Sequence, residues 1–335
     1  MIYEAFIGIF LLTLFFVYLV KKYAPRLGFV DIPNARSMHV TDTPRGAGVG
    51  FFFAIVFVLS YAYPDVLYEF VWVNIAVWMV FFMGVWDDYK DSSPYIKFIV
   101  FIVATIFLSY DNLLIHTLGI YFGADLSLGW VALPFTVFAV VGFTNAINLI
   151  DGLDGLAAGI SMIIFSTFYF IGYENDDMFM MLLSGAFIAG LLAFLIYNWT
   201  PASIFMGDSG SLTTGFVLSV LAIKSLTYIP AISIFYIGAI PIMDTLIVMT
   251  RRKMHGKSMV AGDRCHMHHL FKFVFSGNTA KTILFLVLLQ VGYTLIGLYF
   301  INIIDDGYLL ILFIFNIILF YRLLDNIAKK QRRDC

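Results

Sequence analysis

The sequence predicts an all-α integral membrane protein, a polytopic bundle of about 11 transmembrane helices. Of its 335 residues, 61% are hydrophobic and only 13% are charged. The apolar residues form runs of nearly 20, the length that a helix needs to cross a hydrocarbon layer roughly 30 Å thick. Helices are expected because a backbone inside lipid must satisfy its own hydrogen bonds.

Eleven apolar runs support this count. They span about 2–20, 46–63, 67–85, 95–110, 130–148, 156–173, 178–197, 212–230, 231–250, 282–302 and 307–323. If the connections alternate between two faces, one face holds every Lys and Arg of the chain's 20 except Lys224, which falls inside the eighth run. Basic loops remain in the cytoplasm, so we expect the N-terminus outside and the C-terminus inside.

The connections on the two predicted faces differ in length and chemistry. External connections are short except 111–129, where weak alternation and glycines predict a small hairpin or an interfacial segment. Cytoplasmic connections carry the unusual motifs, at about 21–45, 86–94, 148–156, 198–211 and 251–281. We expect residues 1–335 to form a single transmembrane domain. The net charge of −2 gives no indication of a nucleic-acid partner.

The first motif is a pair of carboxylates, Asp87 and Asp88, at the end of the third run. Adjacent carboxylates repel, so ionising both requires a cation or strong hydrogen bonds nearby. Neighbours on a helix point about 100° apart, which predicts a different role for each. The alternative is a solvated helix end that only terminates the span.

The second motif places a polar side chain at every third position as the fifth run ends: Asn145, Asn148, Asp151 and Asp154. On a helix such residues neighbour one another and form a polar strip. Asparagines at membrane depth need partners, which predicts a water-filled site. A turn built from two Asp-Gly pairs would explain the glycines of this segment but not the asparagines.

The third motif surrounds Asp208 with small residues over 205–211, just before the eighth run. A helix N-terminus there would direct backbone N–H groups at an anion. Asp208 or Ser209 could equally be a plain helix cap. The Gly-Asp-Ser-Gly string also resembles the nucleophile loop of trypsin-like serine proteases, but that fold is an all-β double barrel, so we do not assign Ser209 as a nucleophile.

The fourth motif lies in the longest cytoplasmic loop, 251–281, and combines Arg264 with His266, His268 and His269. Imidazoles and guanidiniums together suit a diphosphate, because both donate hydrogen bonds to negatively charged oxygens. A zinc site is an alternative, although the spacing matches no standard ligand pattern. Contact with anionic lipid headgroups is another.

Together these motifs closely resemble the polyprenyl-phosphate N-acetylhexosamine-1-phosphate transferase family. The likeness covers nearly the whole chain: the Asp87-Asp88-x-x-Asp91 string, segment 145–155, segment 207–211 and the histidine loop occur in family order, and 36–48 resembles the family's first cytoplasmic loop. No glutamate follows the histidines, unlike the muramoyl-pentapeptide transferases of peptidoglycan synthesis. The chain is more similar to the bacterial undecaprenyl-phosphate GlcNAc-1-phosphate transferase branch, which starts O-antigen, common antigen and teichoic acid linkage units.

The resemblance implies an enzyme of the bacterial inner membrane that faces the cytoplasm. It would transfer a sugar 1-phosphate from a UDP-N-acetylhexosamine to undecaprenyl phosphate and release UMP, in contact with membrane lipids and with Mg²⁺, or Mn²⁺ as a substitute. GlcNAc is the expected sugar, and related donors stay open. A muramoyl-pentapeptide transferase is the alternative.

The resemblance also implies roles for individual residues. Asp208 would be the principal Mg²⁺ ligand, with Asp88 as a second. Asp87 or Asp88 would orient or deprotonate the lipid phosphate. The residues expected to contact nucleotide, metal or phosphates are Asn148, Asp151, Asp154, Lys97, Arg45, Arg264, His266, His268 and His269.

A transporter is the rival class, and its mark would be ionisable residues near mid-membrane. Lys224 and Asp244 are the candidates. Several donor sugars and several polysaccharide pathways stay open. Two mechanisms also stay open, one with direct attack by the lipid phosphate and one with a covalent intermediate, as does the oligomeric state.

Overall fold

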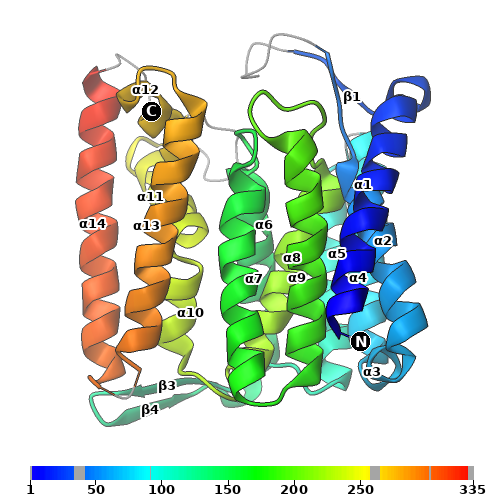
Figure 1. The fold of residues 1–335 in the computed structure, drawn as a ribbon. Coiled ribbons are helices and arrows are strands. Elements are labelled where there is room, and N and C mark those ends of the chain that lie inside the picture. The colour runs from blue at the N-terminus through cyan, green and yellow to red at the C-terminus, as the bar shows by residue number, and fades with distance from the viewer. Residues whose placement is uncertain (1, 34–41, 91, 257–264, 302, 331–335) are drawn as a thin grey trace. The chain divides into compact units, whose positions relative to one another are not determined.

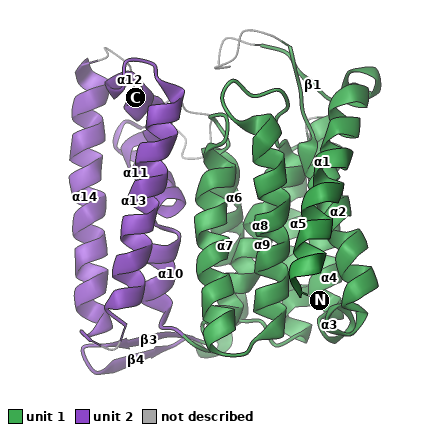
Figure 2. Ribbon diagram, in the orientation of Figure 1, with its two compact units in different colours: residues 1–116, 128–228 green, residues 117–127, 229–335 purple. Residues whose placement is uncertain are grey.

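The computed structural model describes residues 2–33, 42–90, 92–256, 265–301 and 303–330, and most of them are helical (Figure 1). The chain divides into two compact units (Figure 2). Unit 1 comprises residues 1–116 and 128–228, and unit 2 comprises residues 117–127 and 229–335.

Unit 1 is a helical bundle with one small pair of strands. Its helices are α1 (Ile2–Leu27), α2 (Ala47–Ala62), α3 (Pro64–Glu69), α4 (Val71–Tyr89), α5 (Pro94–Tyr110), α6 (Ala132–Ile150), α7 (Leu156–Glu174), α8 (Met178–Asn198) and α9 (Asp208–Ser225), with the 3₁₀ turn η1 (Gly129–Val131) before α6. Strands β1 (Val30–Asp31) and β2 (Thr43–Pro44) pair antiparallel.

Helix α9 is the core of unit 1. Of its 18 residues, all but Asp208 and Lys224 are buried, and α2, α4, α6 and α7 pack around it. Most polar side chains on a buried helix form hydrogen bonds, often with carbonyls of the same helix. Thr213 and Ser219 are examples, since their hydroxyls donate to the carbonyls of Ser209 and Gly215 at 2.7 and 2.9 Å.

Unit 2 combines helices with one two-stranded hairpin. Its elements are β3 (Thr117–Tyr121), β4 (Ala124–Ser127), α10 (Ala231–Ile237), α11 (Ala239–Met254), α12 (Met267–Val274), α13 (Thr279–Tyr299) and α14 (Asp306–Lys330). Strands β3 and β4 pair antiparallel, so the hairpin predicted within 111–129 is confirmed. Helices α10 and α11 meet at an angle of 86°, a break that the continuous apolar run 231–250 did not predict.

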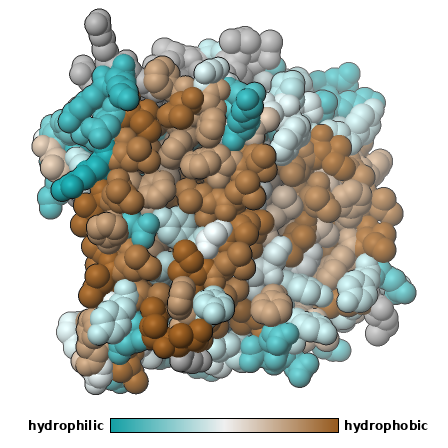
Figure 3. Space-filling model, turned by 60° about the vertical axis from the view of Figure 1, so that its left-hand side comes forward, coloured by the Kyte–Doolittle hydropathy of each residue, from teal (hydrophilic) through white to brown (hydrophobic). Residues whose placement is uncertain are grey.

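Each of the eleven predicted runs is helical, but the count of eleven membrane crossings is not confirmed. Seven helices in the described part of the chain are long and apolar enough to cross a membrane, or eight if the bent pair is one span. Helices α2 and α5 are apolar but have only 16 and 17 residues. On the face drawn in Figure 3, hydrophobic residues form a broad band with hydrophilic residues gathered at its edges, as expected for a multi-pass membrane protein.

Candidate active site

The start of α9 is the point where three segments of unit 1 meet. Gly48 of α2 and Gly84 of α4 lie against it so closely that a Cβ on Gly48 would be 2.1 Å from the Gly210 nitrogen, and one on Gly84 would be 2.5 Å from the Asp208 carbonyl oxygen. The Gly48 N–H also donates to the Met206 carbonyl at 3.0 Å. These glycines therefore allow backbone contacts that fix where α9 begins.

Asp88 holds this helix N-terminus in place. Its two carboxylate oxygens accept the backbone N–H groups of Asp208 and Ser209 at 2.8 and 2.9 Å, and its side chain is only 2% exposed. A carboxylate at a helix N-terminus is stabilised by the unpaired N–H groups and by the helix dipole. Gly207 has a φ of 74°, and a Cβ there would lie 2.6 Å from the Asp88 oxygens. Only glycine fits between Asp88 and α9.

Asp87 has different partners, as expected for a neighbour about 100° around the helix. Its Oδ1 accepts the backbone N–H of Ser92 at 2.8 Å and also the Ser92 hydroxyl. Its Oδ2 lies 2.6 Å from the Lys97 Nζ. The same ammonium lies 2.8 Å from the Oδ2 of Asp208, so Lys97 of α5 links carboxylates that are 121 residues apart in the sequence.

Asn148 completes the contacts of Asp208. Its Nδ2 donates to the Asp208 Oδ1 at 3.0 Å and to the Ser211 hydroxyl at 2.7 Å. The predicted residues Asp87, Asp88, Lys97, Asn148 and Asp208 therefore form one acidic cluster, a name kept for these five below. The sequence did not indicate that Ser211 contacts this cluster, although Ser211 lies one helical turn after Gly207 at the buried start of α9.

Asp151 and Asp154 border the acidic cluster. Burial raises the pKa of the Asp151 carboxyl well above its usual range, and the nearby carboxylates of Asp208, Asp88 and Asp154 raise it further. Asp154 accepts the backbone N–H of Ala202 at 3.0 Å, and it therefore connects the turn after α6 to the loop before α9. The two aspartates are thus in different surroundings, one among acidic groups and one anchored to a loop.

Arg45 lies just before α2 and attracts Asp88 electrostatically. Its Nε is buried and makes no hydrogen bond in the described part of the chain. A buried guanidinium nitrogen without a partner is costly, which suggests that Arg45 contacts a ligand. Arg264, the other predicted arginine, lies outside the described residues, as does Asp91.

The acidic cluster suits a Mg²⁺ ion that is partly coordinated by water and substrate, rather than a metal ion coordinated entirely by protein side chains. Among the described residues, no three Asp, Glu, His or Cys side chains are placed to hold a metal by themselves. Mg²⁺ characteristically uses one or two carboxylates and completes its coordination with water and substrate phosphates. Asp208 suits this role better than Asp88, because the Asp208 side chain is 27% exposed and its partners are side chains, whereas Asp88 is 2% exposed and both its oxygens accept backbone N–H groups of α9.

A second cluster lies in unit 2 and contains His266, His268 and His269. Adjacent rings in this histidine cluster have centroids 5.6 Å apart for His266 and His268 and 4.1 Å apart for His268 and His269. His266 precedes α12 and the other two lie in its first turn, so the helix brings the three imidazoles together.

His268 is the most enclosed of the three. It is 2% exposed, and its Nε2 is buried without a hydrogen-bond partner in the described part of the chain. Burial lowers the pKa of His268 well below its usual range, and His269, His266 and Lys272 lower it further. His268 is therefore neutral near pH 7, and it can offer one N–H to a ligand.

The two residues that would mark a transporter both have local partners. Lys224 lies in the last turn of α9, where its Nζ is 3.3 Å from the Asp177 carboxylate at the start of α8. Asp244 of α11 accepts a hydrogen bond from His266, with 2.7 Å between the Nδ1 and Oδ2 atoms. Neither residue is an isolated charge in the middle of a span.

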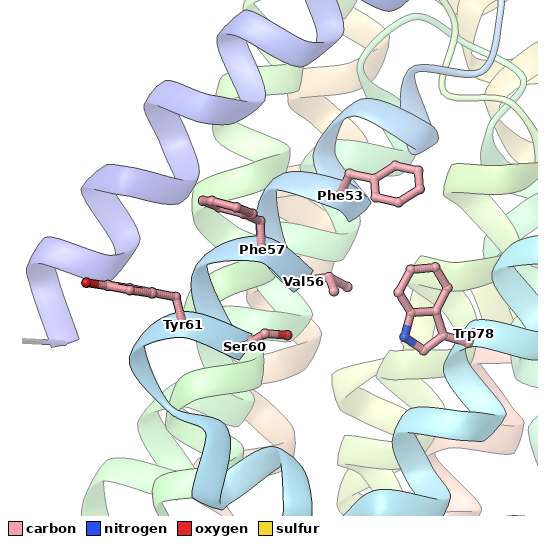
Figure 4. Close-up of a pocket in the computed structure, with 6 residues that line it drawn as sticks. All are labelled: Phe53, Val56, Phe57, Ser60, Tyr61 and Trp78. Carbon is pink, nitrogen blue, oxygen red and sulfur yellow. The ribbon is translucent and has the colours of Figure 1, made fainter.

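Unit 1 also has an apolar groove of about 410 Å³ between α2 and α4 (Figure 4). Its lining residues are Phe53, Val56, Phe57, Ser60, Tyr61 and Trp78. Phe52 of α2 and Phe81 of α4 stack with ring centroids 4.0 Å apart, so aromatic side chains also join the two helices. The helices that form the groove are those that bring Gly48 and the carboxylates Asp87 and Asp88 to the acidic cluster.

A helical membrane bundle with a carboxylate cluster at the ends of its helices suits a membrane-embedded phosphotransferase. The chain belongs to glycosyl transferase family 4, whose family model matches residues 70–226. This assignment confirms the family resemblance drawn from the motifs.

Curated relatives match over most of the chain. A probable undecaprenyl-phosphate N-acetylglucosaminyl 1-phosphate transferase of Bacillus subtilis (strain 168) is 34% identical over 84% of this chain and 81% of its own length. Undecaprenyl-phosphate alpha-N-acetylglucosaminyl 1-phosphate transferases of Yersinia pestis and Escherichia coli (strain K12) are each 31% identical over 79% of this chain, and over 75% and 74% of their own lengths.

Proposed function

We propose that this chain transfers GlcNAc 1-phosphate from UDP-GlcNAc to undecaprenyl phosphate and releases UMP. The relatives' names support both the transferred group and the acceptor, and they favour this reaction over muramoyl-pentapeptide transfer. The observation that carries the proposal is the acidic cluster, in which Lys97 lies between Asp87 and Asp208. The product would serve the first membrane step of a cell-surface polysaccharide.

In this reaction one P–O bond at the β-phosphorus of the donor forms and another breaks. An oxygen of the lipid phosphate attacks the β-phosphorus of the donor, and the bond from that phosphorus to the bridging oxygen breaks, so that UMP leaves. Phosphoryl transfer depends on positioning and on neutralising charge. A bound Mg²⁺ would supply that neutralisation at the diphosphate.

The residues of the acidic cluster divide the remaining tasks. Asp208 would hold the Mg²⁺, and Asn148 would orient the Asp208 carboxylate through its 3.0 Å hydrogen bond. Asp88 would position Asp208 through the N–H groups at the start of α9. Lys97 would bind a phosphate oxygen, and Asp87 would hold the Lys97 ammonium in place. Direct attack by the lipid phosphate needs no covalent intermediate, because the acceptor is already an anionic nucleophile.

Arg45 and the histidine cluster would bind phosphate oxygens. Both contain buried nitrogen atoms that lack partners in the described residues, the Nε of Arg45 and the Nε2 of His268. Hydrogen bonds to charged phosphate oxygens are stronger than those to neutral acceptors, so a phosphate would satisfy such atoms well.

The apolar tail of the acceptor would lie along the groove between α2 and α4. Trp78 of this groove precedes Asp87 by nine residues, which is about 14 Å along a helix. A tail in the groove could therefore leave its phosphate near the acidic cluster. A Trp78→Ala variant tests this placement: it should raise the KM for undecaprenyl phosphate and leave the KM for the donor unchanged.

We further propose that the acidic cluster faces the cytoplasm, with the N-terminus outside and the C-terminus inside. The distribution of Lys and Arg over the connections supports this orientation. Reporter fusions after residues 155, 211 and 335 should report the cytoplasm, and those near 65 and 175 the exterior. A fusion after residue 211 that reports the exterior would refute the orientation.

The test of the proposed function is UMP release by detergent-solubilised protein with undecaprenyl phosphate, Mg²⁺ and a panel of UDP-sugars. We expect UMP release with UDP-GlcNAc, and a chelator of Mg²⁺ should stop it. Release with a muramoyl-pentapeptide donor alone would favour the alternative. Absence of UMP with every donor would refute the proposal.

A further inference from the structure

Two buried residues of α11 hold the segment that leads into the histidine cluster. Asp244 and Arg251 are each 1% exposed and lie seven residues apart, which is two helical turns and places them on one face of the helix. Arg251 donates from its Nη2 to the Cys265 carbonyl at 2.6 Å. Asp244 contacts the next two residues, His266 and Met267.

Asp244 uses its two carboxylate oxygens for different purposes. Its Oδ1 accepts the backbone N–H of Met267 at 2.6 Å, at the first residue of α12. Its Oδ2 lies 2.7 Å from the Nδ1 of His266. An ionised carboxylate can only accept hydrogen bonds, so the His266 Nδ1 must carry the proton that it donates. One side chain thus sets both the start of α12 and the tautomer and ring orientation of His266.

The orientation of His266 also affects the rest of the cluster. The rings of His266 and His268 are nearly parallel, with 11° between their planes, and His268 in turn contacts His269. The Nε2 of His268, buried and without a partner in the described part of the chain, is the atom whose direction this packing controls. Moving α12 or turning the His266 ring would therefore move the nitrogen that we expect to meet a phosphate.

We infer that Asp244 is a positioning residue for the histidine cluster, and that it acts on the donor's phosphate through His266 and α12. This inference rests on the proposed function for its effect on the donor, whereas the positioning itself can be measured without turnover. Carboxylate–histidine pairs fix imidazole orientation in other sites by the same hydrogen bond.

Asp244→Asn separates the two contacts of Asp244. An asparagine oxygen can still accept the Met267 N–H, but the amide nitrogen would donate to the His266 Nδ1 and force the proton onto the other ring nitrogen. Asp244→Ala loses both contacts. We expect Asp244→Asn to raise the donor KM about tenfold, with less than a twofold change in the acceptor KM. In a His266→Ala background the same substitution should change the donor KM less than twofold, because the residue through which it acts is gone.

Gln290→Leu is the matched structural control. Gln290 is fully buried in α13, accepts the Ile240 N–H at 3.0 Å and donates to the Ile237 carbonyl at 2.8 Å. Its loss removes a buried polar anchor at the start of α11, about one helical turn before Asp244, and leaves both contacts of Asp244 in place. We expect this variant to lower the thermal unfolding temperature without changing the ratio of the donor KM to the acceptor KM.

A readout without turnover is the rate at which diethylpyrocarbonate modifies His266 and His268, followed by peptide mass spectrometry. Asp244→Ala should increase the His266 rate at least fivefold, and Gln290→Leu should leave it unchanged. An unchanged rate in Asp244→Ala would overturn the inference, as would an equal rise of the donor KM for Asp244→Asn in both backgrounds. If the rate rises while the wild type releases no UMP from any donor, the proposed function fails and the positioning role stands.

Discussion

On the proposed function, the acidic cluster of unit 1 and the histidine cluster of unit 2 would bind phosphate in opposite ways. In the acidic cluster the carboxylates of Asp87 and Asp208 meet around the Lys97 ammonium, so negative charge is in excess and a cation is required. In the histidine cluster burial keeps His268 neutral and leaves its Nε2 without a partner among the described residues. On this proposal one cluster would depend on the charge of a bound metal and the other on hydrogen-bond donation.

The substitution expected to have the largest effect is Asp208→Asn. It preserves an acceptor for Asn148 but removes the charge that would hold Mg²⁺, so kcat should fall on the order of 10³-fold, the scale of losing a preorganised electrostatic contact. Turnover is measured as UMP release over a range of Mg²⁺ concentrations. Gly207 is the N-cap of α9 and the Asp208 side chain caps no N–H group, so the capping alternative for Asp208 is wrong. If the variant kept more than a tenth of wild-type activity, the Asp208 charge would not be essential for turnover.

Gly84→Ala should cause the next largest fall in kcat, although Gly84 has no side chain that could take part in the reaction. Its new Cβ would need to displace the backbone at Asp208 and Ser209, the closest atoms lying 2.5 and 2.6 Å away. A misplacement of about 1 Å can reduce a rate about 100-fold, so we expect kcat to fall by that order. Gly142→Ala in α6 is the control, because nothing lies within 4 Å of its Cβ position. Equal activity of the two variants would show that the start of α9 does not position Asp208.

His268→Ala should have a smaller and more selective effect. Loss of one hydrogen bond to a charged oxygen should lower kcat/KM for the donor roughly tenfold to a hundredfold, with little change for the acceptor. Steady-state kinetics with each substrate varied in turn measures this difference. Loss of one stoichiometric zinc ion from the His268→Ala protein would instead make the histidine cluster a metal site.

The smallest effect is expected for Asp151→Asn, which should slightly raise the unfolding temperature. The raised pKa of Asp151 means that its ionised form is less favourable in the folded protein, a cost that is present near pH 7 and disappears as the pH falls into the ordinary carboxyl range. Without Mg²⁺, the variant should therefore unfold at a temperature higher by about 2–4 °C, the shift given by roughly 1 kcal/mol. The gain should shrink at acid pH, and a variant less stable than wild type at pH 7 would contradict the electrostatic account.

The sequence predicted the composition of the acidic cluster better than its internal contacts. Apolar runs and the spacing of polar residues were enough to indicate the helices and to select Asp87, Asp88, Asn148 and Asp208. They could not indicate that both oxygens of Asp88 face α9, because that contact depends on Gly84 and Gly207 letting two backbones approach. Helix packing of this kind has no local sequence signal.

The remaining misses have similar physical causes. The break between α10 and α11 occurs inside a run that is apolar on both sides of Gly238, so hydropathy gave no indication of it. Asp244 was interpreted only as an ionisable residue inside a span, since its partners His266 and Met267 lie 22 and 23 residues further along the chain. The count of eleven spans is not confirmed, because short helices such as α2 are apolar without reaching the length that the criterion for a membrane crossing requires.

The central claim is that the sugar moves together with its phosphate, and one labelling experiment tests it most directly. Purified protein would be given undecaprenyl phosphate, Mg²⁺ and UDP-GlcNAc carrying ³²P at the β-phosphate. The account predicts that the label enters the lipid product and that the released UMP is unlabelled. Label that remains in a released nucleotide, as UDP, would mean that the sugar is transferred without its phosphate and would contradict the account.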